Sequence, residues 1–245
     1  MKHMKILVYG EGPDDYGWKD SMGKWHPGPI IYILQKCAEE MDVQLEARYV
    51  EKRFVDGKNK VKLAARHLRK VDGKGIPALR FSIYAMENGY TNGIFYCDTD
   101  KALNGSQKDE ANCRKHFEKV YADVAKGLRI LENPSWRGVP MIALKMIESW
   151  LLSDKEAYRK CFDSEPGKVR LPVKPELIWG EKSNPDSDYP KNYIRRVLEQ
   201  YHEEPGREVF VNIAQETSIG ILKEKCPISF AKFHEEFIEL CASVQ

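Results

Sequence analysis

Apolar runs of strand length alternate with longer amphipathic segments through the first part of this 245-residue chain. The runs at 4–10, 93–97 and 139–143 are nearly continuous, and the run at 43–49 alternates apolar and polar residues. Continuous apolar strands are typical of parallel sheets that are buried on both faces. The pattern therefore predicts a Rossmann-like α/β fold, with a mainly parallel sheet flanked by helices.

The segments between these strands have the spacing of helices. Pro29 suits the first turn of a helix, and the apolar residues that follow it recur every three to four positions. Further helices are predicted by the same spacing at 60–71, 78–86, 108–131 and 144–153. The glycine- and tryptophan-containing stretch 11–28 is predicted to be a loop.

The chain changes character after residue 163. Five prolines punctuate residues 166–190, and only 191–202 and 230–242 keep a clear helical pattern. We therefore divide the chain into an α/β core, residues 1–155, and a mostly helical C-terminal extension, residues 156–245, packed on that core. The two parts are compatible with one compact domain.

Composition restricts the class of protein. Hydrophobic residues make up 42% and charged residues 31%, which is ordinary for a globular chain. No apolar run approaches the roughly 20 residues of a membrane span, and the N-terminus lacks the features of a signal peptide. The 6 cysteines form no CxxC pair, which favours reduced thiols over disulfides or a zinc cage. We expect a cytoplasmic protein without a membrane partner.

Acidic residues follow two of the predicted strands. Glu11 comes directly after the first strand, and Asp98 and Asp100 come directly after the third. Ligands of open parallel sheets bind outside the carboxyl ends of the strands, so these acids meet if the two strands are neighbours. Carboxylates brought together repel one another unless they bind protons or a cation, and oxygen-only ligands favour Mg²⁺ or Mn²⁺. The sequence therefore predicts a metal site formed by Glu11, Asp98 and Asp100.

A fourth acid, Glu148, lies within a strongly apolar helical segment. An acid buried there needs a partner, such as a metal site or Lys145 three residues earlier. We assign Glu148 to the catalytic group, and we predict that Lys145, Lys191 and Arg195 contact phosphates. The alternatives are a surface position for Glu148 and a solvated basic face for Lys191 and Arg195.

Two more acids, Asp14 and Asp15, follow the Glu11-Gly12 pair closely. The Asp14 carboxylate could approach a metal bound at Glu11. Both residues also suit a turn or a helix cap. We favour the turn.

Three segments resemble a known family. The chain is similar to the TOPRIM domain of topoisomerases, primases and OLD-type nucleases, and more narrowly to the bacterial DUF4276 group. The similarity rests on Val8–Gly12, Phe95–Asp100 and Met146–Asp154. It implies that Glu11 acts as general base or metal ligand, that Asp98 and Asp100 hold Mg²⁺, and that Glu148 is a further acid. One departure is Ala102, where some TOPRIM sites carry another acid.

The resemblance also carries the functional expectation. It implies a Mg²⁺-dependent nuclease that acts on DNA or RNA in bacterial defence, with a partner ATPase or a second copy of the chain. One alternative is a TOPRIM-like binding or regulatory subunit without catalysis, which the alanine at position 102 favours. Others are a DxD phosphatase, although the usual threonine after the second aspartate is missing, and a DxD glycosyltransferase.

Overall fold

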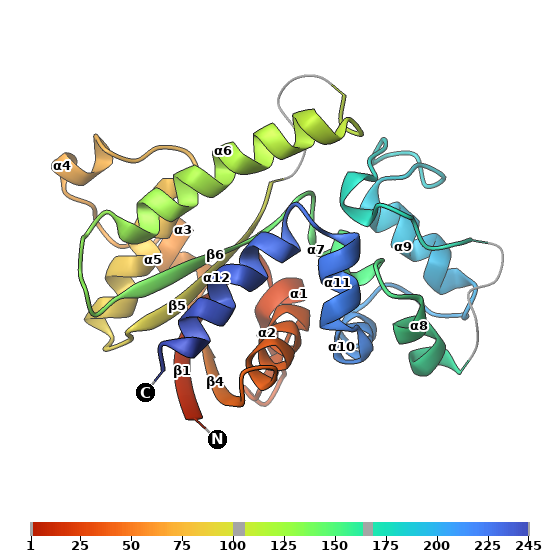
Figure 1. Cartoon of the computed structure of the whole chain (residues 1–245), viewed down its shortest axis with the longest axis horizontal. Helices are drawn as coiled ribbons and strands as arrows, with labels where there is room; N and C mark the ends of the chain where they lie inside the picture. Colours follow the sequence, from red (N-terminus) through yellow and green to blue (C-terminus); the bar gives the residue numbers. More distant parts are fainter. Residues whose placement is uncertain (1, 100–105, 164–168, 245) are drawn as a thin grey trace.

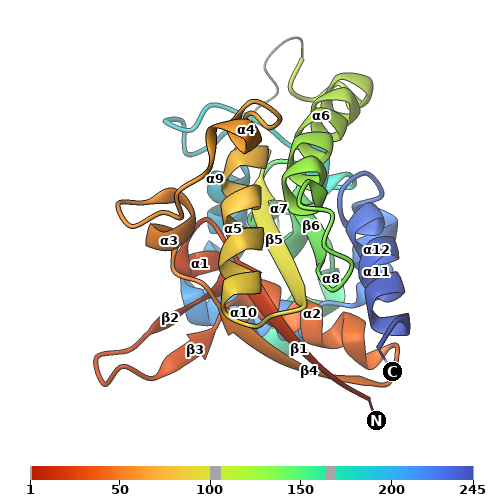
Figure 2. The same ribbon diagram turned by 90° about the vertical axis from the view of Figure 1, so that its left-hand side faces the viewer.

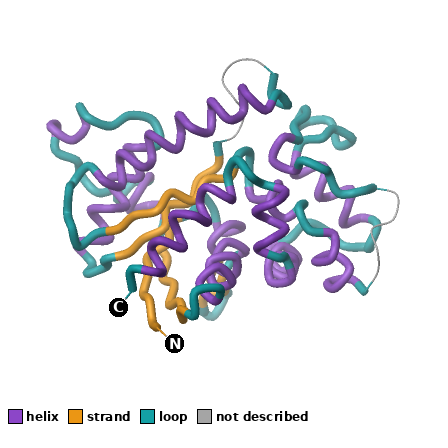
Figure 3. Tube along the Cα trace, viewed as in Figure 1, coloured by secondary structure: helices purple, strands orange, loops and turns teal. Residues whose placement is uncertain are grey.

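The computed structural model describes residues 2–99, 106–163 and 169–244. Its main sheet has four parallel strands in the order β4-β1-β5-β6. The strands are β1 (Lys2–Tyr9), β4 (Val43–Tyr49), β5 (Asn92–Asp98) and β6 (Arg137–Ala143). Helices lie on both faces of this sheet (Figure 3). The predicted α/β fold is thereby confirmed.

Alternating side chains divide the core into two layers. Met4, Ile6 and Val8 of β1 belong to one apolar cluster, and Leu7 and Tyr9 belong to another. Successive residues of a strand point to opposite faces, so a continuous apolar strand supplies both clusters. The first cluster is covered by α2 (Pro29–Glu39) and α12 (Phe230–Ala242), and the second by α5 (Gly75–Glu87) and α6 (Glu110–Arg129) (Figure 1).

The order of the strands creates a switch point between β1 and β5. From β1 the chain passes through α2 to β4 on one side, and it then returns through α5 to β5 on the other side of β1. From β5 the chain continues through α6 to β6, so the connections that leave β1 and β5 run in opposite directions. Ligands of open parallel sheets bind at such a point, and Glu11 and Asp98 lie at the carboxyl ends of these two strands.

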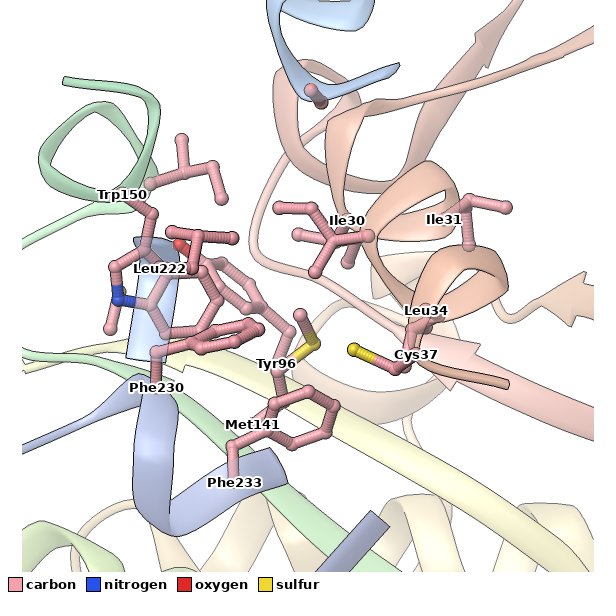
Figure 4. Close-up of a cluster of buried hydrophobic side chains, with 14 of the residues drawn as sticks. Ile30, Ile31, Leu34, Cys37, Tyr96, Met141, Trp150, Leu222, Phe230 and Phe233 are labelled. Carbon is pink, nitrogen blue, oxygen red and sulfur yellow. The ribbon is translucent and has the colours of Figure 1, made fainter. Parts of the chain in front are cut away.

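The C-terminal helices pack on the core without a break in the apolar interior. Helix α10 contacts α2, and α12 contacts β6 and α2. Trp150 and Phe230 meet edge to face with ring centroids 5.2 Å apart, and the Trp150 indole donates a hydrogen bond of 2.9 Å to the Ser229 hydroxyl (Figure 4). The remaining helices here are α8 (Lys155–Phe162), α9 (Pro190–Glu199), α10 (Arg207–Glu216), α11 (Ile219–Lys225) and the 3-10 turn η1 (Pro175–Leu177).

The structure corrects several predicted elements. The predicted loop 11–28 contains the short helix α1 (Pro13–Tyr16) and a hairpin of β2 (Gly17–Lys19) and β3 (Trp25–Pro27), which projects from the body (Figure 2). In its turn, the Asp20 carboxylate accepts hydrogen bonds of 2.9 Å from two backbone N–H groups. Such a side chain closes a turn without any hydrophobic pattern to reveal it.

The predicted helix at 60–71 is also wrong. Only α3 (Lys52–Asp56) and α4 (Ala65–Leu68) form in this region, and Leu68 is 43% exposed. Helices depend mostly on the burial of an apolar face, and this segment buries little. Helix α7 is shorter than predicted (Ile147–Leu151) because the chain is still extended at Met146. Helices α8, α10 and α11 were not predicted.

No helix within the described ranges is both long enough and apolar enough to cross a membrane.

Gly127 tests how tightly the layer of α5 and α6 is packed. A Cβ atom at Gly127 would lie 2.2 Å from the carbonyl oxygen of Gly75 in α5. We expect Gly127→Ala to lower the free energy of unfolding by about 1–3 kcal/mol through overpacking. Gly220→Ala in α11 is the control, because its Cβ would have only the Ser218 hydroxyl nearby, at 3.6 Å. The control should be neutral or stabilised by up to about 1 kcal/mol. Equal urea unfolding curves for Gly127→Ala and wild type would contradict the close helix contact.

Candidate acidic site

Asp98 lies at the carboxyl end of β5, partly exposed. Its Oδ1 atom accepts a hydrogen bond of 2.5 Å from the Tyr96 hydroxyl, whose ring is buried on the same face of the strand. Loss of water raises the pKa of Asp98 well above its usual range, and the negative charges of Asp15, Glu11 and Glu148 raise it further. The bond from Tyr96 works in the opposite direction. Asp98 is therefore held by the core but surrounded by like charges.

Asp15 joins the same group from α1. The side chain is buried, and its Oδ2 atom accepts a hydrogen bond of 2.9 Å from the backbone N–H of Gly12. Burial, followed by the charges of Glu148 and Glu11, raises the pKa of Asp15 to about 7, against the Gly12 bond and Lys191. We favoured a turn for Asp15. The side chain does close a turn, and it also faces the acids.

Glu148 lies in the first turn of α7 and is only 4% exposed. Its Oε1 atom is 3.6 Å from the ammonium nitrogen of Lys191, and its Oε2 atom is buried with no hydrogen-bond partner in the described part of the chain. Burial raises the pKa of Glu148 despite the nearby ammonium. The pKa of Lys191 is raised in turn, chiefly by Glu148 and further by Asp98 and Asp15. Lys191 is thus a counter-cation for the cluster.

Glu11 follows β1, and its carboxylate forms an ion pair with Lys74. Lys74 precedes α5, within the turn Asp72-Gly73-Lys74-Gly75. Sequence reasoning missed this lysine. The only signal was a basic residue between two glycines at the start of a helix, on the connection between β4 and β5.

The structure therefore brings Glu11, Asp15, Asp98 and Glu148 close enough for their charges to interact. Asp100 falls outside the described residues. Within the described ranges, no three or more His, Cys, Asp or Glu side chains are arranged to hold a metal ion. We call Glu11, Asp15, Asp98 and Glu148 the acidic cluster.

Lys145 does not lie with the acidic cluster. The expected helical register between Lys145 and Glu148 is wrong, because α7 begins only at Ile147. The Lys145 side chain is instead buried against Cys113 and Trp179. Its contacts among the described residues are with a thiol and an aromatic ring, and its contact with a phosphate stays a prediction.

A pocket of about 380 Å³ adjoins the acidic cluster. Its walls include Glu148 together with Lys191, Arg195 and Arg207. Arg207 donates to Asp14 at 2.6 Å and also lies over the ring of Trp18. Lys191 and Arg195 are one turn apart on α9, as their spacing predicts. Arg207 was missed, since its helix was not predicted.

Comparison of the chain with models of known families, with curated proteins and with solved structures returns no match.

The raised pKa of Asp15 makes a prediction about stability and pH. The folded state binds this proton more tightly than the unfolded state, whose pKa is about 3.9. The free energy of unfolding therefore falls as pH rises from about 3.9 to about 7. We expect Asp15→Asn to remove part of this loss, so that the variant gains on the order of 2 kcal/mol over wild type between about pH 5 and about pH 8. The measurement is urea unfolding at both pH values.

The matched control is Glu204→Gln, an exposed acid beyond the cluster. This variant should follow the wild-type pH dependence. If Asp15→Asn also follows wild type at both pH values, the carboxyl of Asp15 is not desolvated as described.

Proposed function

We propose that this chain is a divalent-metal-dependent phosphodiester hydrolase of the nuclease type. The observation that carries the proposal is the acidic cluster at the switch point of the sheet. Three of its members, Asp15, Asp98 and Glu148, have a raised pKa because they are desolvated near one another. Raised pKa values grouped at the ligand-binding edge of a parallel sheet are typical of functional sites.

The donors of the acidic cluster fit a hard cation in kind. All of them are carboxylate oxygens, the ligands that Mg²⁺ and Mn²⁺ prefer, and the Oε2 atom of Glu148 has no described partner. Glu11 and Asp98 would hold the ion together with Asp100, since the described residues alone supply no three-ligand group. A bound Mg²⁺ would stabilise charge on the phosphate and lower the pKa of water.

The remaining residues of the site have roles that do not depend on how a metal ion would be coordinated. Asp15 exchanges a proton near neutral pH, because its pKa is about 7. Tyr96 orients the carboxylate of Asp98 through its hydroxyl. Lys191, Arg195 and Arg207 surround the neighbouring pocket with cations that suit a phosphate backbone. DNA and RNA are therefore the proposed substrates.

The resemblance to TOPRIM and OLD-type nucleases agrees with this arrangement, since it names Glu11, Asp98 and Asp100 for the same task. A role in bacterial defence and a partner ATPase or a homodimer rest on that resemblance alone.

The decisive test is cleavage of single- and double-stranded DNA and RNA by the full chain with Mg²⁺ or Mn²⁺. We expect Glu11→Gln and Asp98→Asn to lower the rate at least about 100-fold, since each removes a charge that acts on the reacting groups. Glu204→Gln should retain the wild-type rate. Cleavage that survives both Glu11→Gln and Asp98→Asn would show that another site performs the reaction.

A second candidate is a binding or regulatory subunit without catalysis. It is favoured by the ion pairs Lys74–Glu11 and Lys191–Glu148, which neutralise the acids without a metal. Wild type that binds nucleic acid, cleaves none of the four substrates with either metal, and releases no phosphate from a phosphomonoester would support this function instead.

Arg195 tests the pocket separately from catalysis. Its side chain is exposed on α9 and lines the pocket. In an Asp98→Asn background without metal, Arg195→Ala should weaken binding of single-stranded DNA and reduce the slope of log K against log salt by about 0.7, the loss of one phosphate contact. Fluorescence anisotropy at several salt concentrations measures the slope.

Lys223→Ala serves as the control, because this exposed lysine of α11 does not line the pocket. An unchanged slope for Arg195→Ala would place the nucleic-acid path elsewhere on the molecule.

A further inference from the structure

Lys145 is a buried amine in an unusual environment. The residue lies in the loop between β6 and α7 and is 1% exposed. Its ammonium nitrogen is 3.5 Å from the Cys113 sulfur and lies 5.0 Å from the centre of the Trp179 ring. Within the described residues it has neither a carboxylate nor a carbonyl partner, although a buried charge normally needs one. Burial accordingly lowers the pKa of Lys145, which increases the fraction of neutral, nucleophilic amine.

Cys113 is held beside that amine by the first turn of α6. The thiol is fully buried and donates a hydrogen bond of 3.1 Å to the backbone carbonyl of Gln107. Among the hydrogen bonds of the described chain, the contact with Lys145 is the one that joins a lysine nitrogen to a cysteine sulfur. The pair is therefore two nucleophiles in contact, each fixed by its own segment.

We infer that Lys145 and Cys113 are a site of reversible oxidative modification, at which peroxide joins the two side chains through one oxygen atom. In the first step peroxide oxidises the thiol to a sulfenic acid: the peroxide O–O bond breaks, an S–O bond forms and one water leaves. A second peroxide then oxidises the pair, so that an N–O bond replaces one N–H and the O–H bond, and two waters leave. The product is a sulfur–oxygen–nitrogen bridge, and an excess of dithiol reduces it back to thiol and amine.

The position of the pair connects the modification with the acidic cluster, a step that rests on the proposed function. Lys145 precedes Glu148 by three residues. On the other side, His116 of α6 is hydrogen-bonded at 3.1 Å to the carbonyl of Thr99, next to Asp98. The bridge would therefore tie α6, which is hydrogen-bonded to the residue after Asp98, to the loop that leads to Glu148. We expect oxidised protein to differ from reduced protein in its rate of metal-dependent cleavage.

The bridge itself is tested by mass spectrometry, whether or not the chain is a nuclease. The full chain is treated with hydrogen peroxide, alkylated and digested without reductant. We expect a linked pair of peptides that contain Cys113 and Lys145, with one oxygen gained and two hydrogens lost. Dithiothreitol should abolish the linked pair. Cys161, a half-buried thiol of α8, serves as an internal control and should oxidise without a linked lysine.

Variants separate the bridge from other products. Cys113→Ser and Lys145→Met should each abolish the linked pair, and Cys97→Ser should keep it, because Cys97 is a buried thiol of the same apolar cluster. Three results on wild type would overturn the inference. Cys113 could stay unmodified, it could be oxidised to a sulfenic, sulfinic or sulfonic acid while the Lys145 amine stays free, or it could form a disulfide with Cys97. A linked pair in a chain that cleaves no nucleic acid would support the modification and refute only its link to catalysis.

Discussion

The hydrogen bond from the Tyr96 hydroxyl to the Asp98 carboxylate joins the apolar core to the acidic cluster. The Tyr96 ring packs edge to face on Trp150 with centroids 6.2 Å apart, inside the layer that α2, α7 and α12 cover (Figure 4). Its oxygen reaches the carboxylate of Asp98 two residues further along the same face of β5. Because the ring cannot move without disturbing the core, Asp98 is fixed although it is surrounded by like charges. The same burial that stabilises the sheet thus raises the pKa of the acid at its end.

Two buried glutamates show where a ligand is needed. Both Glu148 and Glu176 have a pKa that is raised by burial. Glu176 is satisfied within the protein: its two oxygens accept hydrogen bonds from the backbone N–H groups of Ile228 and Ser229 and from the Ser229 hydroxyl, which fixes the turn before α12. Glu148 has one distant ammonium and one oxygen without a described partner. The contacts of Glu176 make it a structural residue. Glu148 is the carboxylate that a bound cation or a proton would satisfy.

The sequence predicted what depends on local pattern and missed what depends on packing. The strands, Glu11 after β1 and Asp98 at the end of β5 follow from apolar runs, and the parallel sheet places these strand ends side by side. Asp15 has no such signal. Its side chain closes a turn, and that role alone explains an aspartate at this position, so its place in the cluster cannot be read from the sequence. Lys74 and Arg207 reach the site from segments that are distant in sequence, and only the tertiary structure places them there. Lys145 was assigned to the acids because α7 was extended too far toward its N-terminus.

The lysines of the site bear on both candidate functions. Lys74 and Lys191 stand where positive charge is required, yet their side chains are 36% and 57% exposed. An exposed ammonium contributes little to stability through such a pair and is readily rehydrated. A divalent ion that entered the acidic cluster would compete with these two ammonium groups for the carboxylates. In a protein without catalysis, the same two lysines would be the permanent partners of Glu11 and Glu148. The two functions thus differ in whether the ion pairs Lys74–Glu11 and Lys191–Glu148 persist when Mg²⁺ is added. Lys74 and Lys191 therefore distinguish the two functions as much as the acids do.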